Sequence, residues 1–376
     1  MRSKSLILGH FRNVPIRLHP SLLLLLPLVA LGTANLDLGL LFQKLGIPAH
    51  HLSLPPLAHG MAMAILLFVS VLLHEMGHAA AALKFQLPVG SITLLIFGGA
   101  TEIDQEDATP KQALVTALAG PAVNLMITVF TLVLVKWLPT TMPDAKLMLL
   151  ILGVMNLFLL VFNLIPAFPL DGGRALRALL QLQMSSMRAS YWTAQTGRLT
   201  ALLLGCFGLY IGDLILVMLS VLLYFGAQSE RTQTTIRSAL EGLVAEHAMS
   251  TRVISVSPYL SITAVARDML MGDARAAIVE SAGHIHGVVL PEDLRGMSQD
   301  TVAVLMDGAP LIAQANMPLN EVSRKLTWTG KPAIVIGDDG GVVGVVTNAE
   351  IIRAARLKIL AEQSIESGSE TDEGSD

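Results

Sequence analysis

The chain has 376 residues, and charged side chains make up only 14% of them, against about 25% in a typical soluble domain. Apolar residues reach 53%, the net charge is −4 and the mean hydropathy is +0.62. These values argue against disorder and against an ordinary soluble enzyme, and without a broad basic field we expect no nucleic-acid partner. The single cysteine, Cys206, excludes an intrachain disulfide and a cysteine-rich metal cluster.

Apolar residues are concentrated before residue 229 and predict about six transmembrane helices. A spanning helix needs about 20 mainly apolar residues. The stretches that meet or approach this length are Ile16–Gly32, Leu57–Leu83, Ala113–Leu138, Leu147–Ile165 and Thr196–Ala227. The last is too long for one comfortable span and contains Gly212-Asp213, so we expect two short helices joined by a tight turn there.

Basic residues are concentrated before the first predicted span and after the fourth. Lys and Arg in short loops mark the cytoplasmic side of a membrane protein. With six spans, both basic segments, both termini and the C-terminal half are predicted to be cytoplasmic in a multi-pass cell-membrane protein. The alternative for the N-terminus is a signal peptide cleaved near Gly32-Thr33-Ala34.

A His-Glu-x-x-His motif, His74-Glu75-Met76-Gly77-His78, lies inside the second apolar block. Positions i and i+4 share one face of a helix, so both imidazoles can reach one metal ion while Glu75 projects beside them. A charged side chain inside a membrane costs about 2.5 kcal/mol or more, which makes such residues functional candidates. The alternative is a helix end at the membrane surface with solvated histidines.

Catalytic zinc usually has three protein ligands, and the end of the fourth apolar block offers the third. Two prolines and two glycines interrupt the segment between Asn163 and Arg174, and Asp171 lies among them. Broken helices at membrane depth are tolerated only where the backbone is buried in protein or lines a wet cavity. On local pattern alone, Asp171 is equally well explained as the N-cap of a following helix in a cytoplasmic turn.

These motifs together resemble the site-2 protease family of intramembrane zinc metalloproteases. The resemblance covers residues 10 to about 228, and the segments that carry it are Ile16–Pro20, His74–His78, Ala119–Asn124 and Asn163–Gly173 with its Pro-Leu-Asp-Gly core. It implies one Zn²⁺ per chain, held by His74, His78 and Asp171. It also implies that Glu75 is the catalytic general base and acid in peptide hydrolysis.

The same resemblance implies how a substrate is bound. The substrate would be a transmembrane protein helix that unwinds locally, in regulated intramembrane proteolysis. Asn163 would bind its backbone or polarise the scissile carbonyl, and Asn124 is a weaker substrate-binding candidate, with helix packing as an equal alternative. Ser91–Ile103 predicts a β-hairpin turning at Gly98-Gly99, whose edge could pair with the substrate; the alternative is a simple loop at the membrane surface.

Residues 247–360 contain two similar copies, in which Gly287-Val288-Val289 corresponds to Gly344-Val345-Val346. Each copy predicts the order strand, helix, strand, strand, helix, and the pair resembles tandem CBS domains. The resemblance implies ATP or AMP as a possible ligand, contacted by Thr347 and Glu350 in the second copy. An equal alternative is a structural or dimerising module, through which the chain would form a homo-oligomer.

The predicted fold class is therefore multi-domain. A polytopic α-helical membrane domain of about six spans, with a small membrane-associated β-hairpin, precedes a soluble α/β tandem CBS module. The predicted parts are a transmembrane zinc metalloprotease domain over 1–228, a linker over 229–246, CBS domains over 247–360 and a disordered acidic tail over 361–376. The alternative functions are a CBS-regulated transporter or channel and a catalytically inactive scaffold that binds substrate in the bilayer.

Overall fold

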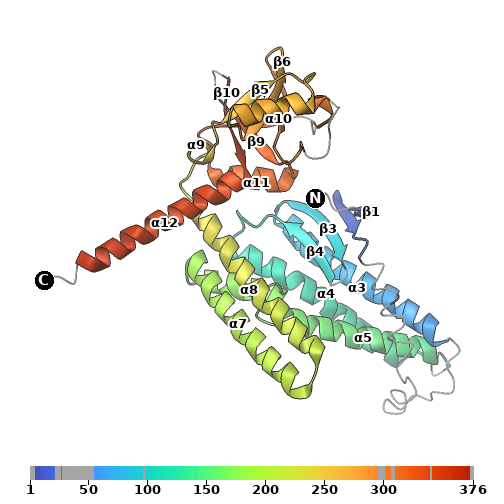
Figure 1. Cartoon of the computed structure of the whole chain (residues 1–376). Coiled ribbons are helices and arrows are strands. Elements are labelled where there is room, and N and C mark those ends of the chain that lie inside the picture. The colour runs from blue at the N-terminus through green and yellow to red at the C-terminus, as the bar shows by residue number, and fades with distance from the viewer. Residues whose placement is uncertain are drawn as a thin grey trace. The chain divides into compact units, whose positions relative to one another are not determined.

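The computed structural model describes residues 5–21, 27, 55–95, 98–139, 141–294, 301–305, 310–338 and 341–372. The chain divides into two compact units, Met1–Arg231 and Thr232–Asp376 (Figure 1). The first unit combines long apolar helices with a four-stranded sheet. The second contains two three-stranded sheets with their own helices.

Three long helices form the centre of the first unit: α3 (Pro56–Lys84), α4 (Pro110–Trp137) and α5 (Pro143–Asn163). Each has a proline in its first turn, where no intrahelical N–H bond is lost. A capping box between Thr109 and Gln112 starts α4, which packs against both of the other two. These contacts bring residues that are far apart in the sequence into one helical core.

Helices α6 (Asp171–Gln181), α7 (Ser186–Ile211) and α8 (Leu214–Leu240) complete the helical part of this unit. The predicted break at Gly212-Asp213 is present: Gly212 has φ +71°, and the Asp213 carboxylate accepts hydrogen bonds from two backbone N–H groups of α8. The two helices are not short, however. Helix α8 continues to Leu240 and includes most of the predicted linker, because no proline or glycine interrupts it after Gly226.

Within the described residues, four helices are long and apolar enough to cross a membrane, namely α3, α4, α5 and α8. The expected count of six is therefore not confirmed. Most of the first predicted span, Ile16–Gly32, lies outside the described residues. Its first residues were assigned wrongly, because Ile16–Leu18 pair as a strand with Ile92–Leu94 instead of starting a helix.

A four-stranded sheet lies beside α3, in the order β1 (Leu6–Phe11), β2 (Val14–Leu18), β3 (Val89–Leu95), β4 (Gly98–Ile103). Strands β3 and β4 form the predicted hairpin, but Leu95 pairs with Gly98, so Gly98 begins the return strand instead of forming the turn. The β1–β2 hairpin was not predicted. Strand β4 is at an edge of this sheet and contacts α3.

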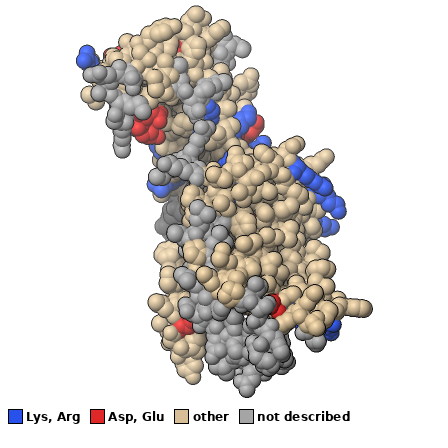
Figure 2. Space-filling model, turned by 90° about the vertical axis from the view of Figure 1, so that its right-hand side faces the viewer, with Lys and Arg blue, Asp and Glu red and all other residues tan. Residues whose placement is uncertain are grey.

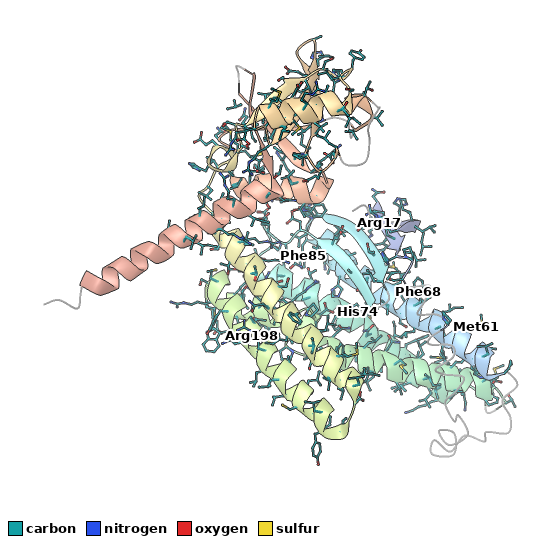
Figure 3. The ribbon with its side chains drawn as sticks, in the orientation of Figure 1. Arg17, Met61, Phe68, His74, Phe85 and Arg198 are labelled. Carbon is teal, nitrogen blue, oxygen red and sulfur yellow. The ribbon has the colours of Figure 1, made fainter. Side chains whose placement is uncertain are left out.

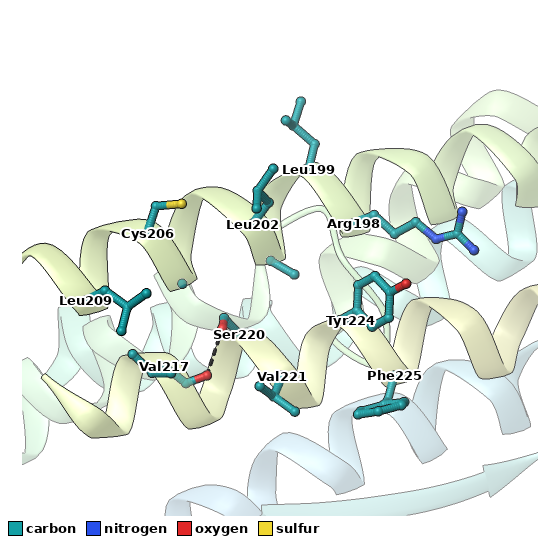
Figure 4. A pocket seen from close by; sticks show the side chains of 12 residues that line it. Arg198, Leu199, Leu202, Cys206, Leu209, Val217, Ser220, Val221, Tyr224 and Phe225 are labelled. Carbon is teal, nitrogen blue, oxygen red and sulfur yellow. Dashed lines mark hydrogen bonds between the residues drawn. The ribbon is translucent and has the colours of Figure 1, made fainter.

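The surface of the first unit is largely apolar. Large apolar side chains are exposed along α4, α5, α7 and α8, among them Phe130, Phe158, Leu203 and Phe225. On the face drawn in Figure 2, uncharged side chains cover most of the described surface. A mainly apolar groove of about 580 Å³ opens between α7 and α8 and includes Cys206, but none of the residues singled out by the sequence (Figure 4).

The second unit repeats one pattern twice. The first copy contains β5 (Val253–Val256), α10 (Ile262–Met271), β6 (Ala276–Ser281) and β7 (His284–Val289); the second contains β8 (Leu311–Gln314), α11 (Leu319–Thr329), β9 (Ala333–Asp338) and β10 (Gly341–Thr347). In each sheet the first two strands are parallel and the last two form an antiparallel hairpin. This is the strand order that the sequence predicted for both copies.

The last predicted helix is present in the second copy as α12 (Asn348–Asp372). In the first copy, the described residues after β7 contain a short 3₁₀ helix, Val302–Leu305. Because α12 continues to Asp372, the structure differs from the predicted disorder over 361–372, and the last four residues of the predicted tail lie outside the described residues. Ala361, Glu362 and Gln363 favour helix and extend α12 without a break.

Candidate metal centre

The His-Glu-x-x-His motif lies in the second half of α3, where His74, Glu75 and His78 are all buried. Figure 3 labels His74 on this helix, between Phe68 and Phe85. Helices α3 and α4 approach closely here because Gly77 has no side chain. A Cβ atom at Gly77 would lie 2.8 Å from the carbonyl oxygen of Ala119 and equally close to a methyl of Val123.

Asp171 reaches the same place from the loop that follows α5. The middle of this loop is buried, with Ala167 and Phe168 almost inaccessible to solvent, whereas Leu164 and Pro169 are exposed. Its tight path onto α6 requires Gly172, where a Cβ atom would lie 2.4 Å from the backbone of Leu164. Asp171 is the first residue of α6, and the N-cap position belongs to Leu170. The structure therefore differs from the N-cap explanation of Asp171.

Three potential ligand atoms meet at this point. His74 Nε2 lies 3.1 Å from Asp171 Oδ2 and 3.1 Å from His78 Nε2, and His78 Nε2 lies 3.2 Å from Asp171 Oδ2. Tetrahedral zinc with bonds of about 2.0–2.1 Å places its ligand atoms about 3.3–3.4 Å apart. The separations are close to those values, and the two imidazoles and one carboxylate are a zinc-type donor set.

The space beside these atoms is kept open by a glycine of α4. A Cβ atom at Gly120 would lie 2.3 Å from Nε2 of His78 and 2.7 Å from Nε2 of His74. No ordinary side chain fits at that position without displacing both imidazoles. The buried triad and the open space at Gly120 together fit a metal ion.

The orientation of His78 is set by α4. Its Nδ1 lies 2.7 Å from the carbonyl oxygen of Thr116, so Nδ1 must carry the proton and donate it. The unprotonated Nε2 is then directed at the triad, as a metal ligand requires. In the part of the chain that the structure describes, Nδ1 of His74 has no hydrogen-bond partner.

Asp171 is held in its charged form. Burial disfavours the carboxylate, but hydrogen bonds and charge interactions with His74 and His78 outweigh burial and lower the pKa of Asp171 well below its usual range. A deprotonated carboxylate is the form that binds a metal ion.

Glu75 faces strand β4 of the small sheet. Its Oε2 accepts a hydrogen bond from the Thr101 hydroxyl at 2.6 Å. Gly99 lies against the same side chain, since a Cβ atom there would be 2.2 Å from Cγ of Glu75. From the sequence, Gly99 was expected only in the hairpin turn and Thr101 was not singled out, although their spacing of two residues along β4 is the signal that places both on one face of the strand.

The two asparagines singled out earlier occupy different surroundings. Asn124 is 0% exposed on α4, one turn beyond Gly120 and on the same helix face. Both of its amide atoms lack hydrogen-bond partners among the described residues. Asn163 is the last residue of α5, half-buried, at the start of the loop that leads to Asp171.

In the second unit, Thr347 and Glu350 bond to each other at the start of α12. The Thr347 hydroxyl donates to Oε2 of Glu350, and the Thr347 backbone N–H donates to the same oxygen at 3.2 Å. Oε1 of Glu350 lies 3.9 Å from Arg275. In the first copy, the Leu290 N–H likewise donates to Asp293 at 2.9 Å. The acidic residue therefore has the same local contact in both copies.

Comparison with known proteins places this arrangement in a family. Residues 62–147 and 139–204 match the model of Peptidase family M50, and residues 244–300 and 302–357 each match the CBS domain. A zinc metalloprotease of Methanocaldococcus jannaschii is 31% identical over 300 residues, which is 80% of this chain and 86% of that protein. The chain belongs to peptidase family M50.

A second curated relative agrees with this membership. A Synechocystis protein, also named as a zinc metalloprotease, is 30% identical over 364 residues, 92% of this chain and 94% of its own length. The solved site-2 protease of Methanocaldococcus jannaschii is 32% identical and covers 60% of this chain and 95% of its own, with a TM-score of 0.42. The resemblance inferred from the motifs is confirmed, and the M50 membership favours the peptidase over the transporter or channel.

Proposed function

We propose that this M50 protein is an intramembrane zinc endopeptidase that hydrolyses a peptide bond in a transmembrane protein, in regulated intramembrane proteolysis. The observation that carries the proposal is the buried triad of His74, His78 and Asp171 beside Glu75. The triad lies in a unit in which α3, α4 and α5 are long and apolar enough for a bilayer.

The triad would hold one Zn²⁺ per chain. When bound, zinc polarises the scissile carbonyl and brings the pKa of a bound water to about 7. The buried His74, His78 and Asp171 supply two neutral ligands and one negative charge. The backbone carbonyl of Thr116 supports this role, because it accepts the hydrogen bond from Nδ1 that fixes the orientation of the His78 ring.

Glu75 would move the proton that hydrolysis requires. Its carboxylate takes a proton from the attacking water as the new carbon–oxygen bond forms. It then delivers that proton to the amine nitrogen as the peptide carbon–nitrogen bond breaks. Burial of the Glu75 side chain, 6% exposed, limits competing contacts with bulk water.

Substrate binding would involve Asn163, Asn124 and strand β4. The amide of Asn124 supports this assignment because both of its polar atoms are buried and have no partner within the described part of the chain. Strand β4 is at the sheet edge and contacts α3 next to Glu75. A substrate segment that unwinds and adds to this edge would satisfy its own backbone groups close to the metal centre.

The protein would be a multi-pass cell-membrane protein with both termini and the CBS domains in the cytoplasm. The support is the excess of Lys and Arg before the first predicted span and after the fourth. The metal centre lies in the second half of α3, toward the end of the helix that carries Lys84. In this topology, that end of α3 would be on the cytoplasmic side.

The CBS domains would regulate the protease by binding ATP or AMP at Thr347 and Glu350. The matched CBS regions and the exposed guanidinium of Arg275 near Glu350 support an anionic ligand there. A purely structural or dimerising role, which would make the protein a homo-oligomer, is the competing function. Calorimetry with AMP and ATP separates them, because the structural role predicts no heat at millimolar nucleotide.

The protease function is tested by membrane proteomics of cells that express either the wild type or Glu75→Gln. A substrate of the enzyme should accumulate uncut only with Glu75→Gln. Identical fragments in both strains would contradict the proposal and favour the catalytically inactive scaffold.

A further inference from the structure

We infer that Thr101 is a positioning residue that holds the Glu75 carboxylate for catalysis. The inference rests on the proposed function and deepens it. The juxtaposition that carries it is the 2.6 Å hydrogen bond between the Thr101 hydroxyl and Oε2 of Glu75. The same hydroxyl also lies 3.3 Å from the Glu75 backbone carbonyl, so both ends of the residue face β4.

The strand geometry directs Thr101 at α3. Thr101 pairs with Ile92 across the hairpin, and Gly99 pairs with Leu94. Cross-strand partners share one face of a sheet, and both Ile92 and Leu94 are completely buried. Thr101 and Gly99 therefore belong to the inner face of the sheet.

In the part of the chain that the structure describes, the hydrogen-bond contacts of the Thr101 hydroxyl are both with Glu75. Ile92 belongs to an apolar cluster with Ala79 of α3, next to which an unbonded hydroxyl would be costly. A hydroxyl can donate only one proton, and a buried carboxylate needs such donors. The bond thus satisfies both groups and selects one position for the carboxylate.

Gly99, on the same strand, leaves the space that the Glu75 side chain occupies. A Cβ atom at this position would lie 2.6 Å from Oε1 of Glu75 as well as from Cδ. One inner-face residue of β4 therefore bonds one carboxylate oxygen, while the next makes room for the other. A general base held in this way loses less conformational freedom when it takes up the proton.

The test compares Thr101→Val, which removes the hydroxyl at nearly constant shape, with Thr101→Ser, which keeps it. In purified full-length protein, we expect Thr101→Val to lower kcat about 10–100-fold with KM and zinc content unchanged, and Thr101→Ser to restore most of kcat. Thr93→Val is the matched control, because Thr93 lies on the other face of the hairpin, and among the described residues its hydroxyl bonds to the Ser91 hydroxyl, at 3.4 Å, and not to Glu75. A Thr101→Val protein with wild-type kcat would overturn the inference.

A second readout needs no catalysis. In the metal-free protein, Thr101→Val should lower Tm in the wild-type background but leave it unchanged in a Glu75→Ala background, since the bond is already lost there. Equal Tm losses in both backgrounds would show that Thr101 acts through packing alone. Loss of activity in Glu75→Gln with additive Tm effects would leave the proposed function standing while this inference fails.

Discussion

The imidazole of His78 donates a hydrogen bond from Nδ1 to the backbone carbonyl of Thr116 at 2.7 Å, across the contact between α3 and α4. The acceptor belongs to the backbone, so the position of α4 along α3 determines the direction of Nε2. A glycine of α4, Gly120, then leaves the space into which Nε2 points. One helix thus orients a ligand and also provides room for the metal.

The ligand assignment predicts which substitutions abolish metal binding. Purified protein should contain about one zinc per chain. His74→Ala, His78→Ala and Asp171→Ala should each lose most of it, because two remaining ligands do not complete a catalytic zinc site. His59→Ala is the control: His59 is equally buried on α3 but pairs with Asp144 at the other end of the helix. Elemental analysis that finds full zinc in Asp171→Ala would refute the triad.

The open space at Gly120 leads to a separate prediction. Gly120→Ala should weaken zinc binding by about tenfold or more, although alanine favours helix, because the new methyl group would occupy the position next to both Nε2 atoms. Competition with a zinc-binding dye measures the loss. Gly9→Ala, where an added methyl meets nothing within 4 Å, should bind zinc like the wild type. Wild-type affinity in Gly120→Ala would mean that the metal lies elsewhere.

Some parts of this site were predictable from local sequence and others were not. His74 and His78 are one helical turn apart, so their shared face follows from helix geometry alone. Asp171 lies 97 residues from His74, and its pattern equally suited a helix cap. The two explanations are distinguished only by the three-dimensional contacts of Asp171 with His74 and His78.

The small sheet was likewise only partly predictable from local sequence. The β-forming residues and paired glycines of Ser91–Ile103 predict a hairpin, but they do not show that Thr101 and Gly99 face Glu75, which depends on how the sheet packs on α3. Local sequence predicts that Ile16–Leu18 starts a span, because its apolar residues continue into a leucine-rich segment. Its pairing with β3 is a long-range contact that no local pattern reveals.

Strand addition predicts where a substrate can be cross-linked. With Cys206 replaced by serine, Ala100→Cys on β4 should form disulfides with single cysteines in a substrate. The yield should alternate with a period of two along the substrate, because strand side chains point to opposite faces. Leu8→Cys on β1, an exposed position at the opposite edge of the sheet, is the control. Equal yields at both edges would contradict docking on β4.

Nucleotide regulation predicts a single functional site in the CBS module. AMP or ATP should bind with one site per chain, because the second copy offers the Thr347 hydroxyl where the first has Leu290. Thr347→Val should weaken binding about tenfold or more, through loss of a hydrogen bond to a charged ligand. Thr327→Val on α11 of the same unit is the control. Unchanged calorimetric affinity in Thr347→Val would remove this residue from the site.

The most direct test of the central claim is cleavage of a transmembrane substrate by purified protein in liposomes, comparing the wild type with Glu75→Gln. The substitution keeps the size of the side chain and removes its capacity to take a proton. We expect Glu75→Gln to retain about one zinc per chain and to lose cleavage by about 100-fold or more. Zinc-loaded Glu75→Gln that cleaves at the wild-type rate would contradict it.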